Sequence, residues 1–213
     1  MTDVCVIFDI DGTLVDSVAA DARLYRIAVR DVLGDVSLRP KWSEYEHITD
    51  AGILRQICHE NGLDVAQCEQ RMRARFGELI AEHLREAGSC QPTRGALNLL
   101  QELRAKLDSR IGIATGGWGH TARMKLARAG YDVSGIPLTS SDDGHERVRI
   151  MEQCRALLPA TAVTIYVGDG EWDKRASELL GWRFIGVGDR LRGSCQHWLP
   201  DFSAPQLVET LLG

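Results

Sequence analysis

The segment VIFDIDGTLVDS, residues 6–17, joins a short apolar run to two aspartates that stand two residues apart. The run Val4–Phe8 is nearly uninterrupted, as a strand covered on both faces should be. Asp9 and Asp11 follow it, and the Gly-Thr turn can curl both carboxylates toward one pocket. Because like charges repel, their ionisation needs a metal, or they share one proton. The alternative is a loop in which both acids cap the next helix.

Strand patterns alternate with helix patterns along much of the chain. Further buried strands are predicted at Ile111–Ala114, Val163–Val167 and Phe184–Val187, with another candidate at Ile136–Leu138. Helical spacing is found at Ala96–Lys106, Thr121–Ala129, Val148–Leu158, Asp173–Leu180 and Gln206–Leu212. This alternation predicts an α/β fold with a Rossmann-like, doubly wound parallel sheet. Right-handed crossovers then place all the strand C-terminal ends at one edge, where such sheets bind ligands.

One stretch interrupts the alternation. From about Ser17 to Ser89 the apolar residues recur only at helical period, in Ala20–Leu33, Ala51–Glu60 and Val65–Arg85. We therefore expect an inserted α-helical domain over residues 17–89, and a core formed by residues 1–16 and 90–213. The expected hinges are Asp16-Ser17 and the stretch Ser89–Pro92.

Composition limits the classes of partner. With a formal net charge of -5, the chain lacks the excess of positive charge that attracts nucleic acid or an anionic membrane. A bound phosphate would therefore have to be met by local groups and a cation. The sequence shows neither a signal peptide nor a transmembrane segment. The 6 cysteines form no C-x-x-C pair, which is typical of reduced thiols in a cytoplasmic protein, with a disulfide framework as the alternative.

The residues after the second predicted strand, Thr115-Gly116-Gly117, offer a hydroxyl and free backbone N–H groups. At a turn that leads into a helix, these groups can bind an anion. The alternative is that Thr115 is only the N-cap of the next helix, with glycines for the turn.

Four segments, in chain order, resemble the signatures of the haloacid dehalogenase (HAD) superfamily. VIFDIDGTLVDS resembles the first, and Thr115 after its strand resembles the second, a strand that ends in Ser or Thr. An arginine at the start of a helix, Arg147 by first choice and Arg149 by second, resembles the third. The segment GDGEWD, residues 168–173, resembles the fourth, G-D-x-x-x-D.

The resemblance implies a Mg²⁺-dependent phosphatase that hydrolyses a small phosphorylated metabolite through an aspartyl-phosphate on Asp9. Asp11 is then the general acid and base. Mg²⁺ is expected to bind Asp9, the backbone carbonyl of Ile10, and Asp169. Asp173 either binds the metal too or holds its water or a neighbour in place.

The phosphoryl group is expected to contact four residues on the core side: Gly12, Thr115, Gly116 and Arg147. This sequence departs from the family pattern at Gly116 and Gly170, where polar residues are often found, and at the third signature, where lysine is commoner than arginine. An acid at position 11 is similar to phosphatases and phosphomutases rather than to members that cleave carbon–halogen bonds.

The helical insertion resembles the family's cap domain, which closes over small substrates. Candidates for substrate contacts there are Arg23, Tyr25, Thr49 and Asp50, with solvated helix faces or an N-cap at Thr49 or Asp50 as the alternative. Trp118 and Trp172 flank the expected site. We expect a monomer or homodimer whose partner is a phosphorylated small molecule. A phosphomutase and a catalytically silent phosphate-binding protein remain as alternatives.

Overall fold

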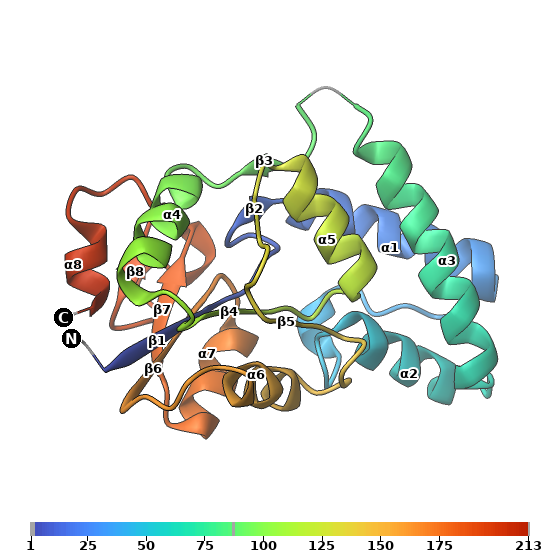
Figure 1. The fold of residues 1–213 in the computed structure, drawn as a ribbon. Coiled ribbons are helices and arrows are strands. Elements are labelled where there is room, and N and C mark those ends of the chain that lie inside the picture. The colour runs from blue at the N-terminus through green and yellow to red at the C-terminus, as the bar shows by residue number, and fades with distance from the viewer. Residues whose placement is uncertain (1–2, 87, 213) are drawn as a thin grey trace.

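The computed structural model describes residues 3–86 and 88–212 (Figure 1). A six-stranded parallel sheet has the order β5-β4-β1-β6-β7-β8 and confirms the predicted α/β class. Its strands are β1 (Val4–Phe8), β4 (Ile111–Ala114), β5 (Leu138–Thr139), β6 (Val163–Gly168), β7 (Arg183–Val187) and β8 (Trp198–Leu199). The four long apolar runs are all strands. The edge strand β8 has only two residues, too few for a pattern to indicate it.

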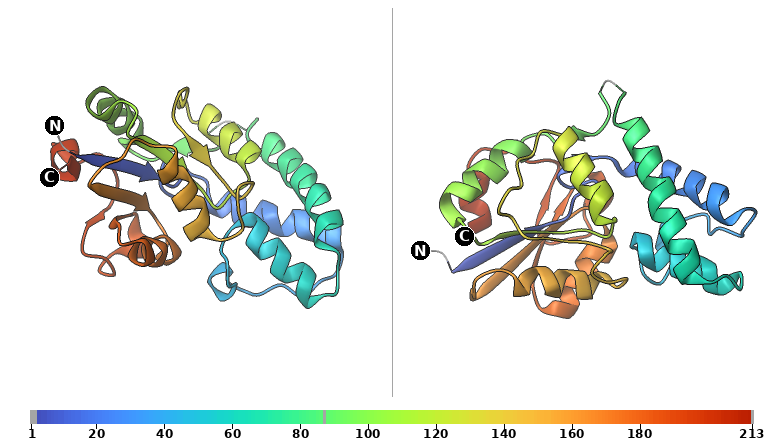
Figure 2. Two further views of the ribbon diagram at one scale, coloured as in Figure 1. Left: turned by 60° about the horizontal axis from the view of Figure 1, so that its bottom comes forward. Right: turned by 45° about the vertical axis from the view of Figure 1, so that its right-hand side comes forward.

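Alternate residues of β1 pack against two different layers of helices, because successive side chains of a strand point to opposite faces of the sheet. Val4, Val6 and Phe8 join one buried cluster with α4 (Ala96–Leu107), α5 (Gly119–Arg128) and α8 (Leu207–Leu212). Cys5 and Ile7 join another with α6 (Arg147–Ala156) and α7 (Glu171–Leu180). Figure 2 shows the two helical layers on the two faces of the sheet, which is the doubly wound arrangement.

The helices of the insertion lie beyond one end of the sheet, away from both termini (Figure 1). α1 (Val18–Leu33), α2 (Asp50–Glu60) and α3 (Val65–His83) enclose a separate hydrophobic cluster, and a short 3₁₀ turn, Trp42–Glu44, precedes α2. Trp118, which comes from the turn after β4, is fully buried in that cluster. Where the chain enters and leaves the insertion, β2 (Val15–Asp16) pairs antiparallel with β3 (Gln91–Pro92). These features support the proposed division into a core and a cap.

Two expectations from composition can be compared with the structure. All six cysteines are free, and five of them are buried. Across residues 3–86 and 88–212, no helix is both long and apolar enough to cross a membrane.

Candidate active site

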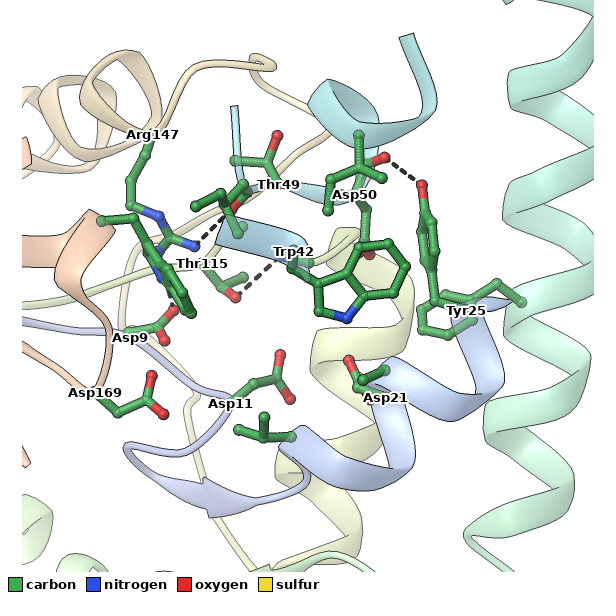
Figure 3. Close-up of a pocket in the computed structure, with 18 of the residues that line it drawn as sticks. Asp9, Asp11, Asp21, Tyr25, Trp42, Thr49, Asp50, Thr115, Arg147 and Asp169 are labelled. Atoms are coloured by element: carbon green, nitrogen blue, oxygen red, sulfur yellow. Dashed lines mark hydrogen bonds and ion pairs between the residues drawn. The ribbon is translucent and has the colours of Figure 1, made fainter. Parts of the chain in front are cut away.

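Three of the four signature segments reach the same edge of the sheet because β1, β4 and β6 are neighbours. Phe8, the last residue of β1, pairs with Ile113 on one side and Val167 on the other. Asp9, Thr115 and Asp169 follow these strand ends directly. Together with residues of the insertion they line a cavity of about 140 Å³ (Figure 3).

Three buried carboxylates lie close enough to hold one metal ion. Ligand oxygens of Asp9, Asp169 and Asp173 are all within 4.8 Å of one another. Burial and the neighbouring Asp173 raise the pKa of Asp9 well above its usual range. Burial also raises the pKa of Asp169 to about 7, although Arg190 opposes this change. Acids this close can ionise together only if positive charge is added. A hard divalent cation with oxygen ligands, such as Mg²⁺, therefore fits this set of residues.

Arg147 is a largely enclosed cation of this site, with its side chain 11% exposed. Its Nη1 lies 2.8 Å from Asp173 Oδ1 and 3.5 Å from Asp9 Oδ1, and its Nη2 donates to the Ile48 carbonyl. Arg149 is exposed, so the geometry selects Arg147 as the cation of the third signature. A Cβ at position 116 would overlap the Arg147 guanidinium, which explains why glycine replaces a polar residue there.

Both oxygens of Asp173 already have partners within the protein. Oδ1 pairs with Arg147, and Oδ2 accepts a hydrogen bond from the Gly170 N–H at 3.0 Å. Of the two roles expected for Asp173, this arrangement favours the orientation of a neighbour over direct metal binding.

The turn after β1 corrects two expectations. The Ile10 carbonyl accepts hydrogen bonds from the Thr13 and Val15 N–H groups, at 3.1 and 2.9 Å, so it does not face the metal site. The Asp11 carbonyl accepts none of the hydrogen bonds in the described part of the chain. The Gly12 N–H donates to the Val15 carbonyl and is likewise unavailable to phosphate. Gly12 instead makes room: its φ is +82°, and a Cβ there would overlap the Asp169 carboxylate.

Thr115 lines the cavity and does not cap the next helix. It is 1% exposed, and its hydroxyl accepts from the Gly117 N–H at 3.2 Å. The residue at the N-cap of α5 is Trp118, so the alternative role of Thr115 is not supported. Within the described residues, the amides of Asp11 and Gly116 donate no hydrogen bond and so remain free to bind an anion.

The structure adds a residue that the sequence did not indicate, Lys125 of α5. Its side chain is 1% exposed, and Nζ lies 2.5 Å from Asp11 Oδ1 and 2.7 Å from Asp21 Oδ2. Burial alone would lower the pKa of Lys125, but the two acids outweigh it and raise this pKa above the usual range. Ser17 Oγ also donates to Asp11 Oδ1, at 2.5 Å. The available signal was the helical period, which places Lys125 on the buried face of α5 with Ala122.

Three of the four expected cap residues line the cavity. Thr49 is the N-cap of α2, and its hydroxyl donates to the His145 carbonyl at 2.6 Å. Asp50 Oδ2 accepts from the Trp118 N–H at 2.9 Å, and the Tyr25 hydroxyl donates to the Asp50 carbonyl at 2.6 Å. The fourth expectation, Arg23, is not supported, because Arg23 is exposed and Asp21 is the charged residue of α1 that reaches the cavity.

Two further side chains complete the cavity. Trp172 lines it, as expected. The Trp118 side chain is instead buried in the cap cluster, and its contribution to the site is the backbone N–H, which donates to Asp50 Oδ2. Arg190, from the 3₁₀ turn Asp189–Leu191, lies 2.8 Å from Asp169 Oδ2. No residue pattern indicated Arg190, which stands in a segment without a signature.

Comparisons with known proteins show the family of this chain. The family model described as haloacid dehalogenase-like hydrolase matches residues 4–181, so the chain belongs to that family. A comparison with curated proteins finds no match. A solved hydrolase from Pseudomonas syringae is 21% identical, with 97% of each chain covered and a TM-score of 0.75.

Two other similar structures carry more specific names. CbbY from Rhodobacter sphaeroides, in complex with phosphate, is 21% identical, with 95% of this chain and 96% of that chain covered and a TM-score of 0.70. The β-phosphoglucomutase of Clostridium difficile is 15% identical, with 100% and 97% covered and a TM-score of 0.72. At these identities the likeness shows the shared fold.

A substitution at Gly12 tests the contact between the first turn and the metal acids. In Gly12→Ala we expect Mg²⁺ to bind at least about tenfold more weakly, because the added Cβ displaces the Asp169 carboxylate. Titration of Mg²⁺ by calorimetry measures this. Gly34→Ala is the matched control: its φ of +79° brings the same backbone strain, but a Cβ there meets no atom within 4 Å. Equal Mg²⁺ affinity in the two variants would contradict the arrangement.

The pH dependence of stability tests the environment of Asp50. Burial and then Asp21 raise its pKa from 3.8 to about 8. Between these values the folded protein keeps a proton that the unfolded chain releases, so rising pH favours unfolding by up to about 1.4 kcal/mol per pH unit. Asp50→Asn lacks this titrating group. In metal-free buffer, its free energy of unfolding should therefore fall less steeply from pH 5 to pH 8 than that of wild type, by up to about 1.4 kcal/mol per pH unit. Urea titrations measure both slopes, and parallel slopes would refute the expectation.

Proposed function

We propose that this protein is a Mg²⁺-dependent phosphatase that hydrolyses a small phosphate monoester through an aspartyl-phosphate on Asp9. The observation that carries the proposal is the position of Asp9, whose carboxylate lies beside Arg147 and within reach of Asp169 in the cavity. An anionic nucleophile can approach an anionic phosphate only where cations neutralise both. Membership of the haloacid dehalogenase-like hydrolase family supports this reaction class.

The residues that would hold Mg²⁺ are Asp9, Asp169 and the backbone carbonyl of Asp11. When bound, the cation neutralises the phosphoryl oxygens and keeps the buried acids ionised. Arg147, the Thr115 hydroxyl and the free amides of Asp11 and Gly116 bind the phosphoryl group. A carboxylate oxygen of Asp9 then attacks phosphorus as the ester P–O bond breaks.

Asp11 moves the protons in both steps. It first donates a proton to the leaving alkoxide, and it then removes a proton from the water that hydrolyses the aspartyl-phosphate. Lys125 Nζ and Ser17 Oγ both contact its Oδ1, which leaves Oδ2 free on the side of the Gly117 turn. Lys125 is therefore a positioning residue for the general acid and base.

The cavity favours hydrolysis over the phosphomutase alternative. A mutase of this kind must also bind a second phosphate, and a phosphate needs a cation or several N–H donors. Among the described residues, the insertion contributes Asp21 and Asp50 to the cavity but no lysine or arginine. Phosphate release in the absence of any bisphosphate activator would further support the hydrolase.

Loss of the nucleophile tests the reaction and separates it from the silent-binding alternative. With p-nitrophenyl phosphate and Mg²⁺, Asp9→Asn should release p-nitrophenol at least about a thousandfold more slowly than wild type, because no aspartyl-phosphate can form. Asp16→Asn, at an exposed position of the same segment, is the control and should retain wild-type activity. Equal trace activity in wild type and Asp9→Asn would mean that the protein is not this enzyme.

Removal of the positioning lysine should depend on the leaving group. In Lys125→Met, kcat/KM for an alkyl phosphate should fall at least about tenfold more than for p-nitrophenyl phosphate, whose leaving group departs without a proton. A purely structural role would lower both values equally. Lys106→Met removes an exposed lysine and should change neither. Thermal unfolding of each variant, measured first, confirms that the protein assayed is folded.

A further inference from the structure

The cavity has two chemically different ends. The core provides the phosphate end, with Asp9, Thr115, Arg147 and Asp169. The insertion provides the opposite end, which Figure 3 shows beyond Asp11. We call this the leaving-group end, and it is formed by Val18, Asp21, Ala22, Tyr25, Trp42 and Asp50. If phosphorus lies beside Asp9, the alcohol part of the ester must lie among these side chains.

The walls of the leaving-group end are apolar and aromatic. The ring of Tyr25 lies 5.6 Å from that of Trp42 and 5.4 Å from that of Phe76, between ring centroids, and Phe76 also lines the cavity. Val18 and Ala22 add aliphatic surface from the same face of α1. Such walls suit methylene groups, and aromatic faces also attract an organic cation.

The acidic or basic side chains that the insertion contributes to this end are both carboxyl groups. Asp21 and Asp50 line it, and no lysine or arginine of the described insertion does. The nearby basic residues are engaged elsewhere. Arg26 lies over the Trp42 ring and donates to the Arg39 and Pro40 carbonyls. Arg73 pairs with Glu69 and Asp142. An anionic substituent on the alcohol would therefore find two carboxyl groups and no counter-ion from the cap.

Both acids present an oxygen that lacks a donor. Asp21 Oδ2 is held by Lys125, but its Oδ1 is buried without a hydrogen-bond partner among the described residues. Asp50 Oδ2 accepts from the Trp118 N–H, and its Oδ1 accepts none of the hydrogen bonds in residues 3–86 and 88–212. Because a buried acceptor such as Asp21 Oδ1 is normally paired, a bound ligand with N–H donors and positive charge would satisfy this end.

From this juxtaposition we infer that the protein hydrolyses phosphate monoesters of short amino alcohols, with the substrate ammonium group bound between Asp21 and Asp50. The inference rests on the proposed phosphatase function and names its substrate class. The ammonium group supplies three donors to the two acids, while Tyr25 and Trp42 contact the carbon chain. The cavity of about 140 Å³ suits a short chain. The same acids reject esters that carry a carboxylate or a second phosphate.

Three esters with the same two-carbon skeleton test the inference: phosphoethanolamine, ethyl phosphate and phosphoglycolate. They differ in bearing an ammonium group, no charge or a carboxylate on the alcohol part. With Mg²⁺ and a phosphate-release assay, kcat/KM should be at least about tenfold higher for phosphoethanolamine than for ethyl phosphate. It should be at least about tenfold lower for phosphoglycolate than for ethyl phosphate.

Variants of the two acids identify the contact. Asp50→Asn and Asp21→Asn should each reduce the ratio of kcat/KM for phosphoethanolamine over ethyl phosphate by about tenfold. Asp31→Asn is the matched control, since Asp31 also belongs to α1 but is exposed and paired with Arg75. That control should keep the wild-type ratio. Using a ratio cancels any general loss of activity or folded protein.

The outcomes separate this inference from the proposed function. If phosphoglycolate is hydrolysed as well as ethyl phosphate, or if both acid variants keep the wild-type ratio, the substrate class is wrong. If none of the three esters is hydrolysed while Asp9-dependent hydrolysis of p-nitrophenyl phosphate is seen, the substrate class is also wrong but the phosphatase stands. If no phosphate ester at all is hydrolysed, both proposals fail.

Discussion

Buried negative charge is the constraint on which this structure depends. Five carboxyl groups line the cavity, on Asp9, Asp11, Asp21, Asp50 and Asp169, and a buried carboxylate persists only beside positive charge or donors. Arg147 forms ion pairs with Asp9 and Asp173, and Arg190 forms one with Asp169. Lys125 pairs with Asp11 and Asp21. These three cations leave an excess of acids at both ends. At the core end the proposed Mg²⁺ balances it, and at the cap end the proposed substrate does.

The central strands could be predicted because a strand covered by helices on both faces must be apolar at nearly every position. The short edge strands were harder to predict, since two-residue β5 and β8 are defined by pairing with β4 and β7 rather than by a local pattern: the candidate Ile136–Leu138 overlaps β5 only at Leu138, and no pattern indicated β8. Helix starts were predicted to within two residues. The predicted start of α2, Ala51, lies one residue inside the helix that Thr49 caps, whereas α5 begins two residues before the predicted Thr121 and has no side-chain cap to indicate its start.

The site could be predicted where chemistry follows a strand end, because parallel register brings Asp9, Thr115 and Asp169 to one edge whatever lies between them. It could not be predicted where the contact depends on how two helices pack. A lysine within a helix is usually exposed, and only the approach of α5 to α1 and to the turn after β1 gives Lys125 its two acidic partners, Asp21 and Asp11. The expectation for Ile10 failed for a local reason: the hydrogen bonds of the turn decide which carbonyl remains free, and the residue pattern does not show them.

Hydrogen bonds and ion pairs join the core to the insertion, in addition to the packing of side chains. The N-terminus of α2 is bound to the core by the Asp50 N–H to the Gly116 carbonyl at 2.7 Å and the Ala51 N–H to Ser141 Oγ at 2.8 Å. Lys125 adds a charged link, since its one ammonium group contacts Asp11 of the core and Asp21 of the insertion. In the proposed mechanism Asp11 protonates the leaving group that Asp21 helps to bind. A substrate cation near Asp21 would compete with Lys125 for the Asp21 carboxylate and leave Lys125 more fully to Asp11, so recognition of the alcohol and its protonation are coupled through one buried side chain.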